Sequence, residues 1–283
     1  MPRLVVAIAM AVGVACGAAP PPCRIVARDV HAAPLLWRVR GPGGAVVWLY
    51  GTIHDAGTDD ISPVAWTLLD AAPRFVSELG DAAPDPDKLS ALARLPWGQV
   101  LDQLLPADDW WELVNAMLGV MSEAELRHAR PWFAMVRLFA HMAQSPRPSM
   151  DDALAEHARK CGVAIESLEP WEAQLVALDT SVTAADLSRA IHARHTVACE
   201  LAGLRSAYRT SDLPALTRTL VGTVQSEALL VERNRRWLPQ IERYLAGDGA
   251  FIAVGLGHLL GDGGLPAMLV RAGYTAERQA EAP

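Results

Sequence analysis

The sequence has few cysteines, no long basic run and no hydrophobic run that spans a bilayer comfortably, and each shortage excludes a class of protein. Its four cysteines include no CxxC pair, which argues against a cysteine-rich zinc site or a thioredoxin-like redox motif. The formal net charge of −7 argues against a nucleic-acid partner, because phosphate binding needs a basic surface. No GxSxG motif supplies the nucleophile of an esterase.

The remaining composition is that of a soluble globular protein. Of the 283 residues, 51% are hydrophobic and 20% are charged. A chain of this length forms one large domain or two small ones and buries a core without covalent staples.

Residues 1–19 differ from the rest of the chain and predict a secretory signal peptide. Arg3 precedes a run of 12 apolar residues, then small residues and a proline cluster. The protein is therefore expected to be exported, to the periplasm, the cell envelope or the medium. Cleavage before Cys16, within a partial lipobox, would attach a lipid and anchor the chain to the membrane; cleavage after Ala18 or Ala19 would leave it unanchored.

Three cysteines remain in the mature chain if Cys16 is removed or lipidated, and an odd number leaves at least one thiol unpaired. Cys161 and Cys199 are a candidate disulfide, although the sequence gives no distance between them. His192, His195 and Cys199 have ligand-like spacing on a predicted helix, but an ordinary helix face is the favoured interpretation.

The order of predicted elements favours an α/β fold with a central mixed sheet formed by both ends of the chain and a large helical insertion. Residues 20–34 read as a flexible linker and residues 35–283 as the folded domain. The predicted strands are 35–39, 45–50, 74–79, 163–168, 250–254 and 274–278. Between them, the apolar periodicity predicts helices at 63–72, 88–145, 150–161, 171–246 and 265–272, the longer stretches being broken by turns.

Two loops near opposite ends of the domain repeat one local design, a hydrophobic strand followed by GxxHxxG. They span Gly51–Gly57 and Gly255–Gly261 and carry His54 and His258. Glycine at the strand exit permits a tight turn with positive φ and a close approach of backbones. Because ligands of open α/β sheets bind at the carboxyl ends of strands, the two histidines are expected to face one cleft.

Two histidines need carboxylates to complete a catalytic metal site. Glu78 is the first candidate, because it ends the predicted strand 74–79, and Glu169 is the second, because it follows the predicted strand 163–168. A charged residue at the end of a buried strand is costly unless it is paired or belongs to a site. Arg233 and Asn234 lie in a basic cluster on a predicted helix, which is either a solvated face or a pair directed at the site.

These motifs resemble the TraB/GumN family, which includes the TraB and PrgY proteins and the Tiki proteases. The resemblance rests on Leu49-Tyr50-Gly51-Thr52-Ile53-His54, on Glu78, on Glu232-Arg233-Asn234-Arg235-Arg236-Trp237 and on Ala253-Val254-Gly255-Leu256-Gly257-His258. It implies a fold like that of ChaN and EreA and a metalloprotease-like activity supported by manganese or cobalt. Asp55, directly after His54, departs from the usual family pattern.

The resulting hypothesis is a metal-dependent hydrolase, in the first place a peptidase acting on exported or extracellular peptides. His54, His258 and Glu78 would hold a divalent ion (manganese, cobalt or zinc) that activates water. Glu169 or Asp55 would act as a base or further ligand, and Arg233 and Asn234 would stabilise the oxyanion. The alternative is a protein that binds a peptide or small molecule on the same scaffold without turnover.

Overall fold

The computed structural model describes residues 25–29, 32–81, 84–143, 145, 148–221 and 227–279. The predicted signal peptide, Cys16 and both cleavage positions lie outside the described residues. Within the described ranges, no helix combines the length and the apolar character needed to cross a bilayer.

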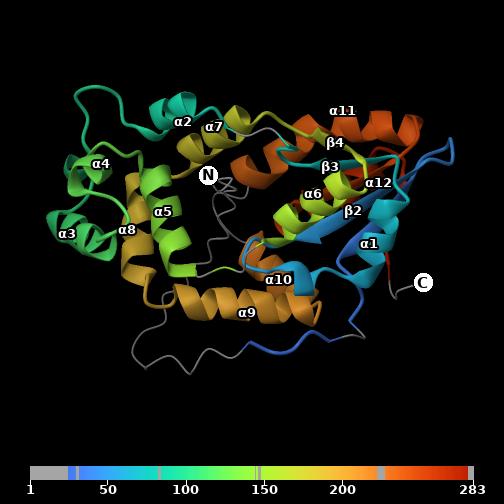
Figure 1. The fold of residues 1–283 in the computed structure, drawn as a ribbon, viewed down its shortest axis with the longest axis horizontal. Coiled ribbons are helices and arrows are strands. Elements are labelled where there is room, and N and C mark those ends of the chain that lie inside the picture. Colours follow the sequence, from blue (N-terminus) through green and yellow to red (C-terminus); the bar gives the residue numbers. More distant parts are fainter. Residues whose placement is uncertain are drawn as a thin grey trace. The chain divides into compact units, whose positions relative to one another are not determined.

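The chain forms two compact units, which are treated separately (Figure 1). The helical unit contains Ala83–Gln144 and Trp171–Ala202, and the sheet unit contains Ile25–Ala82, Ser145–Pro170 and Gly203–Pro283. The prediction of a large helical insertion in an α/β fold is confirmed.

The sheet unit is built on a six-stranded mixed sheet with the strand order β4-β3-β5-β2-β1-β6. Its strands are β1 (Leu36–Arg40), β2 (Val46–Thr52), β3 (Arg74–Ser77), β4 (Ala164–Ser167), β5 (Ala250–Gly255) and β6 (Thr275–Arg278). β1 pairs antiparallel with β2 and with β6, which confirms the predicted hairpin. The four strands β4, β3, β5 and β2 are parallel to one another, so their carboxyl ends share one edge.

β2 and β5 lie side by side although about two hundred residues separate them. Their register runs from Val47 opposite Ala250 to Thr52 opposite Gly255. The first five residues of β5 are all buried, as expected for a parallel strand covered on both faces. The sheet therefore brings the two strands with GxxHxxG loops together, as the repeated pattern predicts.

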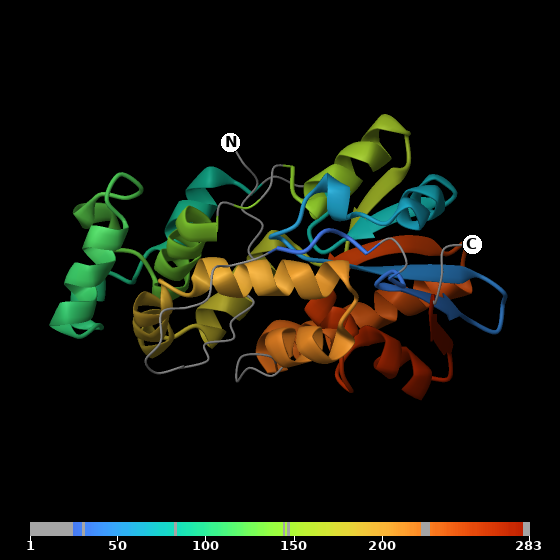
Figure 2. The same ribbon diagram turned by 90° about the horizontal axis from the view of Figure 1, so that it is seen from below.

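Helices cover both faces of this sheet (Figure 2). On one face lie α1 (Pro63–Asp70) and α6 (Met150–Lys160); on the other lie α10 (Leu213–Leu220), α11 (Glu232–Ala246) and α12 (Leu265–Arg271). Helix α6 buries Met150, Leu154 and Ala158 at intervals of four residues, with Ala153 and Ala155 beside them, and together they form one apolar stripe.

The helical unit contains α2 (Pro86–Ala93), α3 (Ala107–Ala116), α4 (Glu123–Arg127), α5 (Pro131–Ala143), α7 (Trp171–Ser181) and α8 (Ala184–Ala193). Helix α9 (Val197–Arg209) begins in the helical unit and ends in the sheet unit. Capping boxes fix the starts of α4 and α8, where Ser122 pairs with Glu125 and Thr183 with Asp186. These capping residues explain why new helices begin at α4 and at α8 within the two long predicted helical stretches.

Part of the predicted linker is attached to the sheet unit. The backbone N–H of Val26 donates to Ser206 Oγ over 3.2 Å, and that of Asp29 donates to the carbonyl of Arg209 over 3.3 Å. Arg28 Nη1 donates to the carbonyl of Ile61 over 2.5 Å. Residues 25–29 thus run along the folded unit before β1 begins.

The candidate disulfide between Cys161 and Cys199 is wrong. Cys161, just after α6, is a free and exposed thiol, whereas Cys199 on α9 is disulfide-bonded. The spacing of two cysteines in the sequence does not determine the distance between their thiols, so the sequence alone cannot establish this pairing. A half-cystine offers no thiolate, so Cys199 cannot bind a metal with His192, whose Nε2 instead lies 2.9 Å from Asp109 Oδ1.

Candidate functional site

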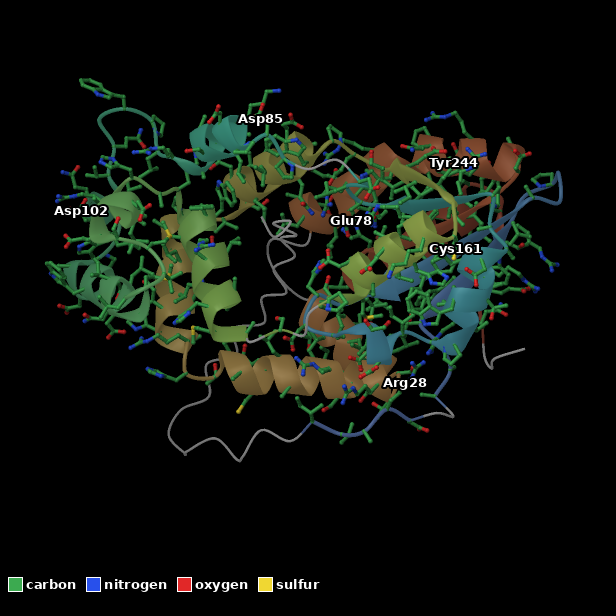
Figure 3. The ribbon with its side chains drawn as sticks, in the orientation of Figure 1. Arg28, Glu78, Asp85, Asp102, Cys161 and Tyr244 are labelled. Carbon is green, nitrogen blue, oxygen red and sulfur yellow. The ribbon has the colours of Figure 1, made fainter. Side chains whose placement is uncertain are left out.

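The carboxyl ends of the four parallel strands bring together the residues that the sequence singles out. Glu169 follows β4, Glu78 follows β3, His258 follows β5 and His54 follows β2. Pairing continues beyond β3 and β4, where the N–H of Glu169 donates to the carbonyl of Glu78 over 3.0 Å. Four side chains from distant parts of the sequence therefore occupy one edge of the sheet (Figure 3, which labels Glu78).

Gly51 and Gly255 make this edge compact because they have no side chain. A Cβ on Gly51 would lie 2.4 Å from Cδ1 of Leu256, so a larger residue would separate the two loops. The N–H of Gly255 donates to Glu78 Oε1 over 2.8 Å, and a Cβ there would come within 3.2 Å of the same oxygen. The expected positive φ at the strand exit is absent at both glycines; in the second loop it occurs at Gly261, with φ of 71°. Close approach is therefore the reason for glycine at the strand exits.

Asn234 fixes the tautomer of His258. Its Nδ2 donates to the carbonyls of His258, at 3.1 Å, and Gly263, at 2.8 Å, so its Oδ1 must be the acceptor that faces the imidazole. That oxygen lies 2.7 Å from His258 Nδ1. The hydrogen of the neutral ring therefore sits on Nδ1, and the lone pair of Nε2 is directed into the site.

Arg233 connects His258 to the two glutamates. Its Nη2 lies 2.6 Å from Glu78 Oε2 and 2.5 Å from Glu169 Oε1, and its Nη1 lies 3.1 Å from His258 Nε2. Nη1 also donates to the carbonyl of Leu229 over 3.1 Å, in the π-helical turn η3 (Glu227–Val231) that precedes α11. Every one of these contacts is buried or partly buried, so the guanidinium neutralises carboxylates that water cannot fully solvate.

The carboxylate of Glu169 and the amide of Asn234 are both engaged in hydrogen bonds within the protein. Glu169 Oε1 accepts from Arg233 Nε over 2.9 Å, and its Oε2 accepts from Trp237 Nε1 over 3.2 Å. With 6% exposure, Glu169 holds Arg233 and is poorly placed to take a proton from a substrate water. Asn234 is fully buried and has both ends of its amide bonded, with its Oδ1 on Nδ1 of His258.

The charges of the site shift the pKa values of Glu78 and His258. Burial alone would raise the pKa of Glu78, but Arg233, His258, the Gly255 N–H and His54 outweigh it and lower that pKa to about 2. Burial, assisted by Arg233 and His54, lowers the pKa of His258 to about 3 against the opposing effect of Glu78. At neutral pH, Glu78 is thus an anion and His258 a neutral base.

His54 is held by Asp151, a residue that the sequence did not single out. Asp151 Oδ2 lies 2.9 Å from His54 Nδ1, and its Oδ1 accepts from Thr52 Oγ1 over 2.7 Å. Burial lowers the pKa of His54, but the Asp151 carboxylate and, more weakly, Glu78 and Asp152 raise it above its usual value. Asp151 stands at the start of α6, where an acidic residue is common because it stabilises the helix N-terminus, so nothing in the sequence marks this contact.

Asp55, the departure from the family pattern, is held by two side chains. Its Oδ2 lies 2.6 Å from Arg205 Nη2 and its Oδ1 accepts from Ser145 Oγ over 2.9 Å. Both oxygens of this buried carboxylate are thereby used in joining the first loop to α9 and to Ser145.

The donor chemistry fits a divalent ion. Glu78 supplies an ionised carboxylate, and His258 bonds its Nδ1 to a protein partner, as metal-binding histidines do. His54 Nδ1 lies 2.9 Å from Asp151 Oδ2, but the two atoms are not aligned as a hydrogen bond. Glu78 Oε1 and His258 Nε2 lie 3.8 Å apart. The ligand atoms of the three residues do not all come within 4.8 Å of one another, so His54 must approach the other two to complete the set. The His54 side chain is 22% exposed.

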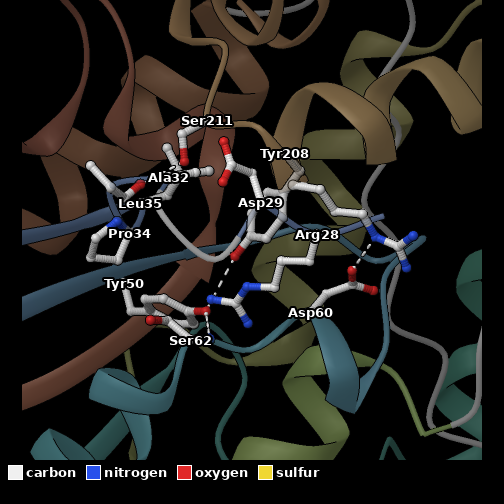
Figure 4. A pocket seen from close by; sticks show the side chains of 12 residues that line it. Arg28, Asp29, Ala32, Pro34, Leu35, Tyr50, Asp60, Ser62, Tyr208 and Ser211 are labelled. Atoms are coloured by element: carbon white, nitrogen blue, oxygen red, sulfur yellow. Dashed lines mark hydrogen bonds and ion pairs between the residues drawn. The ribbon is translucent and has the colours of Figure 1, made fainter. Parts of the chain in front are cut away.

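A small cavity lies behind the first loop (Figure 4). It measures about 20 Å³ and is lined by residues including Arg28, Tyr50, Asp60 and Tyr208. Tyr208 Oη donates to the carbonyl of Gly51 over 2.7 Å, so the cavity wall supports the loop that carries His54. A space of this size accepts about one water molecule and no organic substrate.

Comparison with known proteins identifies one relationship. The model of the TraB/PrgY/gumN family matches residues 35–278. Neither curated proteins nor solved structures provide a significant match.

Proposed function

Because the chain belongs to the TraB/PrgY/gumN family, and because its sheet edge gathers two histidines and an ionised glutamate, we propose that it is a metal-dependent hydrolase. His54, His258 and Glu78 are the proposed ligands of a divalent ion. The single observation that carries this proposal is the orientation of His258, whose Nδ1 is fixed by Asn234 so that Nε2 presents its lone pair beside Glu78.

The surrounding residues have positioning roles in this proposal. Asp151 orients His54, and Asn234 orients His258. Glu169 holds Arg233, and Arg233 keeps Glu78 ionised, since the guanidinium contributes to the low pKa of that carboxyl. This assignment replaces a direct role in proton transfer or oxyanion binding for Glu169 and Asn234.

A divalent ion at this site would supply Lewis acidity, which lowers the pKa of water and polarises a carbonyl group. Glu78 enters such a site already deprotonated, and His258 enters it neutral, so neither must lose a proton at neutral pH. The cluster combines three carboxylates (Glu78, Glu169 and Asp151) with the guanidiniums of Arg233 and of Arg236, which lies 4.0 Å from Glu169 Oε2, and the remaining negative balance favours a cation. The resemblance to Tiki proteases makes a peptide bond the first target to test.

Export is part of the proposal. Disulfides persist in oxidising compartments and are rare in the cytosol, so the disulfide of Cys199 supports a location outside it. The signal-like residues 1–19 agree with this location.

A binding protein without turnover is the second candidate, and the position of Arg233 favours it. Its Nη1 lies 3.1 Å from the nitrogen that would bind the ion, so a cation already faces the lone pair of His258. If Arg233 stays beside His258 Nε2 when metal is added, the edge of the sheet binds a ligand without activating water.

The decisive assay is hydrolysis of a peptide library by the purified protein with Mn²⁺, Co²⁺ or Zn²⁺ and with chelator. We expect cleavage that depends on metal and disappears in His54→Ala, whereas Arg235→Ala, an exposed change on α11, retains it. Cleavage that survives both chelation and His54→Ala would refute the mechanism. Stoichiometric ligand binding without product would support the second candidate.

A further inference from the structure

A second group of potential metal ligands lies on the α1–α6 surface of the sheet unit. Asp70 ends α1, His157 lies in the last turn of α6, and Cys161 follows that helix directly (Figure 3, which labels Cys161). In the described residues, these are the three ligand-type side chains whose donor atoms all lie within 4.8 Å of one another. We propose that Asp70, His157 and Cys161 form a surface site for a zinc-like divalent ion, separate from the site at the sheet edge.

The geometry favours ligands around one ion over a catalytic triad. In a triad, the acid and the nucleophile contact different nitrogens of the histidine. Here both approach the same nitrogen, His157 Nε2: Asp70 Oδ1 lies 2.6 Å from it and Cys161 Sγ lies 3.6 Å from it. A thiolate, an imidazole nitrogen and a carboxylate oxygen converging on one point are the donor types that zinc binds.

The separations agree with tetrahedral coordination after a small movement. Zinc bonds of about 2.3 Å to sulfur and about 2.05 Å to nitrogen, at a tetrahedral angle, place these two ligand atoms about 3.5 Å apart. The observed separation of Cys161 Sγ and His157 Nε2 is 3.6 Å. The 2.6 Å contact between Asp70 and His157 is a hydrogen bond, in which Nε2 donates to the carboxylate. An ion would replace that proton and widen the pair by about 0.8 Å, which the half-exposed Asp70 side chain can accommodate.

The backbone holds Cys161 in place and the local field favours a cation. The N–H of Cys161 donates to the carbonyl of His157 over 2.9 Å, and Gly162, with φ of 72°, ends the helix in the left-handed region. The carboxyl ends of α1 and α6 both reach the cluster, and the partial negative charge of helix carboxyl ends attracts cations. The indole of Trp66 packs against His157 with ring centroids 4.8 Å apart and restricts the imidazole.

Binding has defined proton changes. Coordination requires Cys161 to release its thiol proton to solvent and the neutral His157 ring to carry its hydrogen on Nδ1 in place of Nε2, so one proton is released for each ion bound. No oxidant or further reactant is needed. With three protein ligands at the surface, the fourth position remains open to solvent.

The test is alkylation of Cys161 by iodoacetamide in the full-length protein, with and without one equivalent of Zn²⁺, mapped by mass spectrometry. Since the thiolate is both the nucleophile and the ligand, we expect zinc to slow the reaction about tenfold or more. Asp70→Asn and His157→Asn should lose this protection. His192→Asn should keep it, because His192 forms a comparable ion pair with Asp109 but has no free thiol beside it.

A spectroscopic measurement separates this site from the proposed active site. Co²⁺ should give a thiolate-to-metal charge-transfer band that vanishes in Cys161→Ser and persists in His54→Ala and His258→Ala. Unchanged alkylation with zinc, equal protection in His157→Asn, or loss of the cobalt band in His54→Ala would each overturn the proposal. None of these outcomes depends on whether the sheet-edge site hydrolyses peptides.

Discussion

Glu78 and Glu169 lie just beyond the ends of two adjacent parallel strands and share Arg233 as a counterion. The backbone N–H of Glu169 donates to the carbonyl of Glu78 over 3.0 Å, and Arg233 Nη2 contacts a carboxylate oxygen of each residue at 2.6 and 2.5 Å. Two buried carboxylates this close would repel one another without the guanidinium. The stability of the sheet edge therefore depends on Arg233, whatever reaction the site performs.

Replacing Arg233 by Met should destabilise the protein severely. The change leaves two buried carboxylates without their cation, and removal of one partner from a buried ion pair typically costs about 3–5 kcal/mol. The measurement is the free energy of unfolding from urea denaturation. Arg235→Met is the matched control, because Arg235 pairs with Glu227 at a surface where both side chains are 60% exposed; we expect a loss of about 1 kcal/mol or less. Equal losses in the two variants would contradict the shared-counterion account.

Asn234→Leu should weaken metal binding more than it changes the fold. The variant removes the acceptor that keeps the hydrogen of His258 on Nδ1, and loss of such a partner typically lowers metal affinity about 10- to 100-fold. Titration calorimetry with Mn²⁺ measures the affinity, and circular dichroism checks that the fold persists. Unchanged affinity in a folded Asn234→Leu protein would show that His258 is not a ligand, or that its tautomer is fixed by another contact.

Asp151→Asn should lower the pKa of His54. The negative charge of Asp151, 2.9 Å from Nδ1, raises that pKa against the effect of burial, so the neutral amide removes the largest contribution in this direction. Titration of the His54 ring followed by NMR measures the change. Asp152→Asn is a suitable comparison, since Asp152 has the smaller effect and should shift the titration less. A pKa that rises or stays constant in Asp151→Asn would contradict the role given to this carboxylate.

The metal-free protein should lose stability as the pH falls. The pKa of His258 is about 3 in the folded chain, against an ordinary value of 6.5. Its contribution to the free energy of unfolding is therefore complete above pH 6.5 and is lost as the pH falls toward 3. The pKa of Glu78 is lowered from 4.5 to about 2, so Glu78 also loses its stabilising contribution as the pH falls, but at lower pH. The pKa of His54 is raised, so its contribution to stability has the opposite pH dependence and is lost as the pH rises. Unfolding free energies in chelator, measured against pH, should show a shallower slope in His258→Gln; an unchanged slope would count against a neutral, buried His258.

The fold was predictable from the sequence where the signals were local or repeated. The strand followed by GxxHxxG occurs twice, and this repetition predicts that His54 and His258 share an edge; β2 and β5 indeed pair in parallel there. The predicted ends of two strands also identified Glu78 and Glu169 as candidate site residues. These inferences needed only strand polarity and the rule that parallel strands end together.

The contacts within the site were not predictable, because they depend on which atoms of distant elements meet. Nothing in the sequence distinguishes Asp151, a carboxylate that contacts His54, from Asp152, which accepts a hydrogen bond from Ser149 at the start of α6. The sequence likewise suggests that Asn234 faces a substrate, whereas both ends of its amide are bonded within the protein. The state of Cys161 also required a three-dimensional structure, since spacing does not determine disulfide pairing.

The metal site formed by His54, His258 and Glu78 can be tested by titrating the Cys161→Ser protein with Mn²⁺ and following the loss of the free-ion EPR signal. This background removes the thiol of the second proposed site, so the titration reports on the sheet edge. We expect one bound ion per chain and an affinity that falls roughly 100-fold or more when His54→Ala or His258→Ala is added. Binding of equal strength in all three proteins, or no binding in any of them, would contradict a metal site formed by His54, His258 and Glu78.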